Sequence, residues 1–408
     1  MLSAQLPLKD SSSDAVPTPI AVLKPPSIAG SNTLKALATA SSAASSAATH
    51  SDVAELSLRN ISISDNDNEP LLKPNPRRFV LFPIQFNEIW QAYKNLEANF
   101  WSAEDVEMSD DLADFEKLSR KEQSFVLQTS SILCMGCGLT SEAILSRYSD
   151  EIQVPEARCF FGFQLMQKNI HSELSMVILD MFCESEQQRD DLLDVIQQLP
   201  SRTLWTNWAR TNMTRSEGSF AFRIASLAIF HALHQVSIRD AIAYIAGPHT
   251  AVLPATSRET HPLAGVVHAM HKIHHDQSQY ISFMAIIKAR LVHQANVKDI
   301  HNMVATAVDA ERTLIEDLFH LSGGSIHLCD TTVVKTALLT RVQFHADRCL
   351  ALLGFPILYN VQDPLPWIAA LLLRESNKNC NETHITPVAN TTKQIMEEDH
   401  SFTVDEDF

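Results

Sequence analysis

The 408-residue sequence has few glycines, no long apolar run and a deficit of positive charge. Only 10 glycines interrupt the chain, and no alternation of β-branched residues or hairpin signal is found, which argues against an all-β fold. The absence of 18 consecutive apolar residues predicts that no segment spans a membrane. With 48 acidic and 32 basic residues the formal charge is −16, which argues against binding to nucleic acid or to anionic membranes.

The seven cysteines are an odd number, and they are scattered through apolar segments. The N-terminus lacks the basic, apolar and cleavage-site pattern of a secretory signal. A reducing compartment is therefore expected, the cytoplasm or possibly the nucleus. Cys134 and Cys137 form a C-x-x-C inside a helical run, but no second pair accompanies them. We interpret them as structural cysteines rather than as a redox pair or half of a zinc site.

Composition divides the chain into three parts. Residues 1–68 are rich in Ser and Ala and nearly free of aromatics, which predicts disorder; a transit peptide fits less well because the first arginine is Arg59. Residues 69–375 have helical periodicity throughout. Residues 376–408 are polar again and predict a flexible tail.

The central part predicts an all-α bundle of long helices. Ser119 and Glu122 have capping-box spacing at the start of a run that reaches about Tyr148. Pro155 is expected at the first position of another helix. Further helical runs cover about 218–245, 262–293, 297–320 and 331–353. One apolar stripe near the start is formed by Phe86, Ile89, Trp90, Tyr93, Leu96 and Phe100.

Histidines recur at helical spacing and raise the possibility of a transition-metal site. They are His231 with His234, and the group His268, His271, His274 and His275. No glutamate accompanies them in an H-E-x-x-H arrangement. We therefore interpret them as histidines on the polar faces of helices.

Three strings carry a resemblance to a known family: EPLLKPNPRRFVLFPIQFNEIWQAYKNLEANFWSAEDVEMSDD, then EARCFFGFQLMQKNIHSE, then the terminal FTVDEDF. Together they resemble the small subunit of class I ribonucleotide reductase, over residues 69–375 and the last seven. The resemblance implies a ferritin-like helical bundle. It also implies a diiron or iron–manganese centre beside a tyrosyl radical.

The family's metal ligands are an Asp after E-E-V, an E-x-x-H pair, a lone Glu and a second E-x-x-H. The resemblance assigns these six positions to Glu107, Lys168, His171, Leu227, Gln277 and Tyr280, and the radical tyrosine to Ser175. Only His171 keeps the family's residue. Glu107 and Lys168 have opposite charges that sum to zero, so we expect them to form an ion pair, and we expect no bound metal and no cofactor.

The family's radical-transfer route uses a Trp, an Asp and the ligand His, which Trp90, Asp276 and His171 match. The route also needs a tyrosine in the C-terminal tail. No tyrosine occurs in residues 371–408, and Val388 stands at its expected place. We interpret the matching trio as hydrogen bonding in the core.

The last seven residues resemble the peptide with which the family binds the large subunit, with two phenylalanines for a pocket and three acids for association. They are Phe402, Thr403, Val404, Asp405, Glu406, Asp407 and Phe408. The favoured function is an auxiliary small subunit that pairs with a competent one, as a heterodimer, or with a second copy. The alternatives are an enzyme with a rebuilt metal site and a regulatory protein that competes for the large subunit.

Overall fold

The computed structural model describes residues 69–136, 138–214, 218–247, 262–323 and 331–369. Within these ranges the regular structure is helical and no strand occurs, so the predicted all-α bundle is confirmed. The expected disordered segment 1–68 lies outside the described residues, as does the expected tail 376–408.

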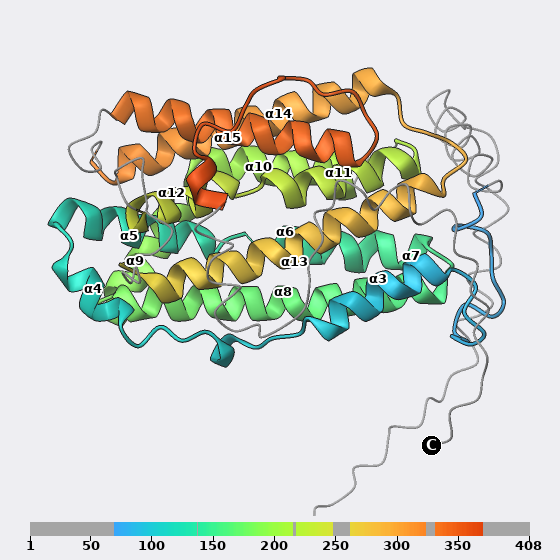
Figure 1. Cartoon of the computed structure of the whole chain (residues 1–408), viewed down its shortest axis with the longest axis horizontal. Coiled ribbons are helices and arrows are strands. Elements are labelled where there is room, and N and C mark those ends of the chain that lie inside the picture. The colour runs from blue at the N-terminus through green and yellow to red at the C-terminus, as the bar shows by residue number, and fades with distance from the viewer. Residues whose placement is uncertain (1–68, 137, 215–217, 248–261, 324–330, 370–408) are drawn as a thin grey trace, which may run out of the picture. The chain divides into compact units, whose positions relative to one another are not determined.

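The helices follow in the order that Figure 1 shows. The first half contains α3 (Asn87–Ala98), η1 (Ala103–Asp105), α4 (Asp111–Lys117), α5 (Arg120–Leu133), α6 (Gly138–Ala143), η2 (Ile144–Tyr148), α7 (Ser149–Glu151) and α8 (Pro155–Phe182). The second half contains α9 (Glu186–Gln197), α10 (Pro200–Ala209), η3 (Arg210–Thr214), α11 (Phe220–Leu233), α12 (Val236–Ala246), α13 (Ala264–Ala289), α14 (Val297–Leu321) and α15 (Thr331–Leu352).

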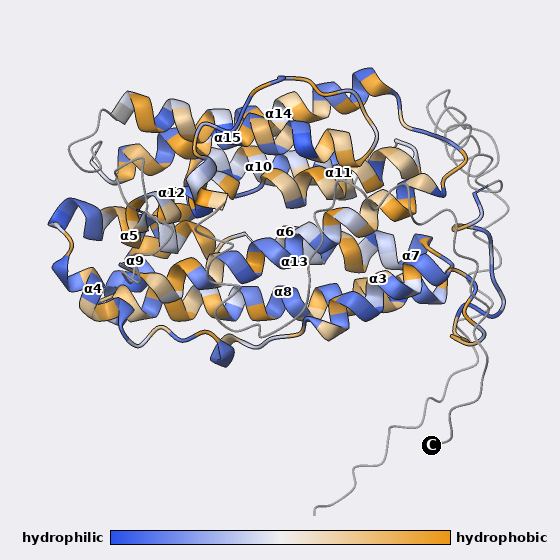
Figure 2. Cartoon of the chain, in the orientation of Figure 1, coloured by the Kyte–Doolittle hydropathy of each residue, from blue (hydrophilic) through white to orange (hydrophobic). Residues whose placement is uncertain are grey.

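The helix α11 is the centre of the bundle. It packs against α13, α14 and α15, and α13 in turn contacts α3 and α8. Nearly every residue of α11 is buried, and Figure 2 shows the apolar residues concentrated where the helices face one another. Residues 220–246 are long and apolar enough by composition to cross a membrane, although the sequence analysis predicted no membrane-spanning segment. In the structure, however, 83% of the most apolar window is buried inside the bundle. That burial is typical of the core helix of a globular domain.

The start of α13 is capped by a side chain from another helix. Its own preceding residue, Leu263, has a positive φ of 59° and provides no side-chain cap. Instead, the buried carboxylate of Asp111 in α4 accepts hydrogen bonds from Gly265 N (3.0 Å) and Val266 N (2.7 Å). A Cβ on Gly265 would lie 2.4 Å from the carbonyl oxygen of Glu107, so only glycine allows this approach. These contacts fix α4 and residue 107 over the N-terminus of α13.

Replacing Asp111 with alanine should lower the free energy of unfolding by about 2 kcal/mol, because two buried backbone N–H groups lose their acceptor. Guanidinium denaturation would measure the change. The matched control is Asp110→Ala, since the neighbouring Asp110 is exposed and makes no side-chain cap. Equal losses in the two variants would contradict the capping role of Asp111.

A second buried carboxyl, Glu311 of α14, holds the junction between α11 and α12. It is fully buried and accepts hydrogen bonds from Trp205 Nε1 (3.0 Å), Gln235 N (2.8 Å) and both the backbone N–H and the hydroxyl of Ser237. Gln235 has a positive φ of 61°, which ends α11 and starts α12. The carboxyl therefore joins α10, α14 and this break in the central helix.

Burial raises the pKa of Glu311 to about 7, from an ordinary value of 4.5. Between these pH values folded Glu311 keeps a proton that it releases in the unfolded chain, so the contribution of Glu311 to stability falls as pH rises through this window. The buried histidines, whose pKa values are lowered, contribute in the opposite direction in both proteins. The native chain should therefore lose about 3 kcal/mol relative to Glu311→Gln between the two pH values. Unfolding measured at pH 5 and pH 8 for both proteins would check this. A pH dependence that is the same in the two proteins would contradict it.

Candidate functional site

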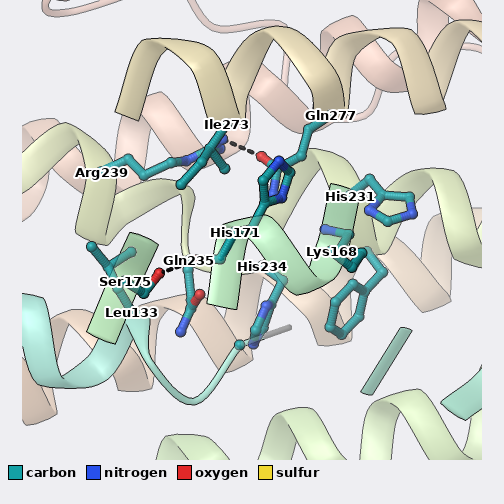
Figure 3. A pocket seen from close by; sticks show the side chains of 12 residues that line it. Leu133, Lys168, His171, Ser175, His231, His234, Gln235, Arg239, Ile273 and Gln277 are labelled. Atoms are coloured by element: carbon teal, nitrogen blue, oxygen red, sulfur yellow. Dashed lines mark hydrogen bonds between the residues drawn. The ribbon is translucent and has the colours of Figure 1, made fainter. Parts of the chain in front are cut away.

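A small cavity lies at the centre of the bundle, where α8, α11, α12 and α13 meet the end of α5 (Figure 3). Its volume is about 30 Å³, which is room for one or two water-sized particles. It is lined by Leu133, Gly136, Lys168, His171, Ser175, Phe230, His231, His234, Gln235, Arg239, Ile273 and Gln277.

Three of the predicted site residues come from one face of α8. Lys168, His171 and Ser175 are separated by three and four residues, which places them on consecutive turns. Lys168 is only 4% exposed, and its ammonium lies 5.3 Å from the centre of the Tyr280 ring. The Ser175 hydroxyl donates to the carbonyl oxygen of His171 at 2.7 Å. The sequence thus brought these three side chains together correctly.

The expected Glu107–Lys168 ion pair is wrong. Glu107 follows η1 in an exposed loop, and its carboxylate accepts a hydrogen bond from the backbone N–H of Ser109 at 2.9 Å. Lys168 is buried in the middle of α8. The exposed Glu107 carboxylate is solvated by water. Moving it into the core would cost desolvation energy that an ion pair with Lys168 need not repay.

The interpretation of Trp90 as the tryptophan of the buried trio is also wrong. The indole Nε1 of Trp101 donates to Asp276 Oδ2 at 3.0 Å, and His171 Nε2 donates to the same oxygen at 2.8 Å. The Trp101 and His171 rings stack 5.7 Å apart. Trp90 lies instead against Phe82 and Tyr93. The trio is therefore Trp101, Asp276 and His171.

Spacing could not distinguish the two tryptophans. They are 11 residues apart, close to three helical turns, so both fit one face of a continuous helix. The helix α3 ends at Ala98, however, and the chain then turns Trp101 into the core, where it is 5% exposed. Choosing between Trp90 and Trp101 required knowing where α3 ends, which the spacing of the residues does not show.

The remaining predicted ligand positions are neutral side chains in the core. Leu227 is buried among the apolar residues of α11. Gln277 lines the cavity and accepts a hydrogen bond from Arg239. Tyr280 donates its hydroxyl to Gln167 Oε1 at 3.0 Å.

The histidines at the cavity are uncharged at neutral pH. Burial, with Lys168 and Arg239 nearby, lowers the pKa of His234 to about 3. Burial also lowers the pKa of His171 and, further, that of His231. Burial lowers the pKa of Arg239 only to about 10, so its guanidinium stays protonated. The sequence did not single out Arg239, although an arginine inside the apolar run of α12 was a signal that could have found it.

The other sequence candidates form no metal cluster in the described part of the chain. His268, His271 and His275 follow one another along α13 with ring centres about 6.4–6.5 Å apart. Among the residues described, no group of three or more His, Cys, Asp or Glu side chains could hold a metal ion. Cys134 Sγ lies 3.3 Å from the Ser175 carbonyl oxygen, and Cys137 is outside the described residues.

Comparison with known proteins gives one consistent result. The family model "Ribonucleotide reductase, small chain" matches residues 78–366. The ribonucleoside-diphosphate reductase small chain of Schizosaccharomyces pombe is 30% identical over 349 residues, which is 84% of each chain. That of Spisula solidissima is 29% identical over 344 residues, 83% of this chain and 84% of the relative.

Solved structures agree with this result. The ribonucleotide reductase Rnr4 homodimer of Saccharomyces cerevisiae superimposes with a TM-score of 0.65 at 25% identity, covering 78% of this chain and 95% of that one. The dimanganese(II)-NrdF of Streptococcus sanguinis has the same fold, with a TM-score of 0.58 at 16% identity over 72% of this chain and 98% of that one.

These comparisons contradict the expectation that a cofactor is absent, because the matched family includes a protein that is described with two manganese ions. The side chains that line the cavity, however, are not typical metal ligands. Iron and manganese in such bundles are held mainly by carboxylates, whereas the residues that line this cavity include Lys168 and Arg239 and no Asp or Glu. This donor set does not fit a pair of metal ions, and we derive no chemical step through one.

The family model covers more than half of the chain, and the helices of the described residues are arranged as in the solved structures that match it. The ferritin-like bundle expected from the sequence is the fold of these relatives. The chain therefore belongs to the ribonucleotide reductase small-chain family.

Proposed function

We propose that this chain is an auxiliary small subunit of ribonucleotide reductase that does not carry the tyrosyl radical itself. The observation that supports this most is Ser175, which the sequence resemblance assigns to the position of the family's radical tyrosine. It is 3% exposed, beside the cavity, and its aliphatic hydroxyl cannot form a phenoxyl radical. The helix α8 contains no tyrosine that could replace it, and the preceding turns of the same face carry Lys168 and His171.

In this role the chain pairs with a radical-bearing small subunit, or with a second copy of itself, and contributes structure to the complex with the large subunit. The relative from Saccharomyces cerevisiae is described as a homodimer, which supports pairing between small chains. The trio of Trp101, Asp276 and His171 then serves to hold the loop after α3 against α13 and α8 rather than to conduct a radical. Each side chain of the trio is at most 5% exposed.

Reconstitution tests the proposal directly. The large subunit is mixed with this chain, with a radical-bearing small subunit, or with both, and the reduction of ribonucleoside diphosphates is measured together with the tyrosyl EPR signal. We expect neither turnover nor a radical signal with this chain alone, and more turnover with both small chains than with the radical-bearing one alone. A tyrosyl signal in this chain alone would refute the proposal. Turnover that falls as this chain is added would instead establish a competitor.

Binding to the large subunit is assigned to residues 402–408, which lie outside the described residues. Burying Phe402 and Phe408 against the large subunit would be worth about 1.5–3 kcal/mol for each side chain, so deleting the seven residues should weaken binding by about 100-fold or more. Surface plasmon resonance with immobilised large subunit would measure this. The matched control deletes residues 389–395, which has the same length and leaves both Phe402 and Phe408 in place. Equal affinity of the two deletion variants would exclude docking by the terminal peptide.

A further inference from the structure

The outer face of α13 carries histidines that the proposed function does not use. His271 and His275 lie about one helical turn apart on this face, each partly exposed, and further along it Ser278 and Ser282 are exposed. The buried residues of α13 lie on the other sides of the helix, and one of them, Ile273, lines the central cavity. Neither of the two histidines lines that cavity, so they belong to the surface of the bundle.

The spacing of these two imidazoles suits a shared metal ion. Residues four apart project from the same side of a helix, and the ring centres of His271 and His275 are 6.4 Å apart. A metal–nitrogen bond of about 2.0–2.1 Å places two imidazoles on one ion with their ring centres roughly 5–6.5 Å apart. Small rotations of the two side chains are therefore enough to bring one nitrogen of each ring to a common ion.

Both rings have nitrogen atoms that no protein group uses. Within the described ranges neither imidazole makes a hydrogen bond or an ion pair, and Nδ1 of His271 is buried without a partner. Burial, with His275 and His268 nearby, lowers the pKa of His271 to about 4, so this ring is neutral at neutral pH and has a lone pair to donate. The adjacent His274 differs, because its Nδ1 atom lies 3.4 Å from a guanidinium nitrogen of Arg239.

The surrounding charge allows a cation at this pair. Lys272, which follows His271 in sequence, holds its ammonium 5.4 Å from the centre of the Trp101 ring, which belongs to the loop after α3. The chain as a whole has a formal charge of −16, which favours the approach of cations. Imidazole nitrogens bind zinc, copper and nickel, whereas magnesium and calcium prefer oxygen ligands. The chemistry of the pair therefore selects a transition-metal ion.

We propose that His271 and His275 together bind one divalent transition-metal ion of the zinc type on the outer face of α13. No third His, Cys, Asp or Glu joins them among the residues that the structure describes, so water completes the coordination. Two protein ligands leave positions open, which makes this an exchangeable site rather than a closed structural one. The site is separate from the cavity of Lys168 and His171 and independent of the proposed role in the reductase.

The first test is a zinc titration of the full chain by calorimetry. Histidines elsewhere in the chain can also bind zinc, so the comparison of variants decides. His271→Gln and His275→Gln should each weaken one binding event by about tenfold or more. The control His320→Gln removes an exposed histidine of α14 and should leave that event unchanged. Magnesium in place of zinc should not bind at this site. An unchanged titration in either of the two α13 variants would overturn the proposal.

The second test uses the native chain, so it decides even if a variant folds poorly. A crystal soaked in zinc chloride is measured at the zinc absorption edge, and we expect an anomalous peak about 2.0–2.1 Å from one nitrogen of His271 and one of His275. No peak at the pair, or a peak bound to one ring alone, would overturn the proposal. A peak that appears only far above the zinc concentration that saturates the titration would mark an adventitious ion only, and would overturn it as well.

Discussion

Replacing Glu311 with leucine should lower the free energy of unfolding by about 4 kcal/mol or more, one of the largest losses that a single change can cause in this chain. The carboxyl is the acceptor for Trp205 Nε1, Gln235 N and both donors of Ser237. Leucine fills the space but accepts nothing, so these buried donors lose their partner at about 1–3 kcal/mol each. Equilibrium unfolding in guanidinium would measure the loss.

Two comparisons make this result specific. Glu316→Leu changes another glutamate of α14, but that carboxylate is exposed and paired with Lys335 at the surface, so it should cost less than about 1 kcal/mol. Hydrogen exchange should also show that Glu311→Leu opens the α11–α12 junction, residues 233–238, more readily than residues 220–232 of α11. A uniform loss of protection along α11 would contradict the role given to this carboxyl at the α11–α12 break.

That break marks a limit of helix prediction from the sequence. A single helix was expected over about 218–245, but α11 ends at Leu233 and α12 begins at Val236. The residue between them that turns the chain, Gln235, is in the left-handed conformation. Glutamine carries no local signal for a positive φ. The conformation is imposed by tertiary contacts: its backbone N–H donates to Glu311 and its side chain donates to the carbonyl oxygen of Ile132.

Helix ends that depend on local chemistry were predicted well. The capping box of Ser119 and Glu122 is formed, and Pro155 is the first residue of α8. The ends of α13, α14 and α15 lie within a few residues of the expected ones. In contrast, the run expected to continue from Ser119 to Tyr148 is broken after Leu133. Apolar spacing persists across such a break, so periodicity alone cannot show it.

The candidate site divides in the same way. Lys168, His171 and Ser175 share one helix, and helical spacing alone places them together. Glu107 and Trp90 depended on how loops and helix ends meet the core, which spacing does not contain. The sequence analysis did not identify Arg239, because a single arginine in an apolar run does not show which residues of other helices it will contact. The charge of the cavity therefore emerged only from the packed bundle.

Replacing Arg341 of α15 with methionine should release residues 354–369 from the bundle, because this arginine holds the segment through Asp363 and Leu365. Arg341 is 2% exposed. It donates to Asp240 Oδ2 at 2.7 Å, to both carboxylate oxygens of Asp363 at 2.7 Å, and to the carbonyl oxygen of Leu365 at 2.9 Å. Arg341→Met keeps an unbranched apolar stem but leaves two poorly solvated carboxylates, those of Asp240 and Asp363, without their cation. Removing one partner of such a buried pair costs about 3–5 kcal/mol.

The matched control is Arg348→Met, two turns further along α15, where the arginine is exposed and lies over the Phe344 ring. It should change the free energy of unfolding by less than about 1 kcal/mol. Hydrogen exchange should show residues 354–369 released in Arg341→Met and retained in the control. The double variant Arg341→Met with Asp363→Asn should lose less than the sum of the two single changes, because the second change removes one of the carboxylates left without a partner. Strictly additive losses would mean that Arg341 acts through packing rather than through charge, and that the segment is held by other contacts, such as that of Trp367 with Tyr244.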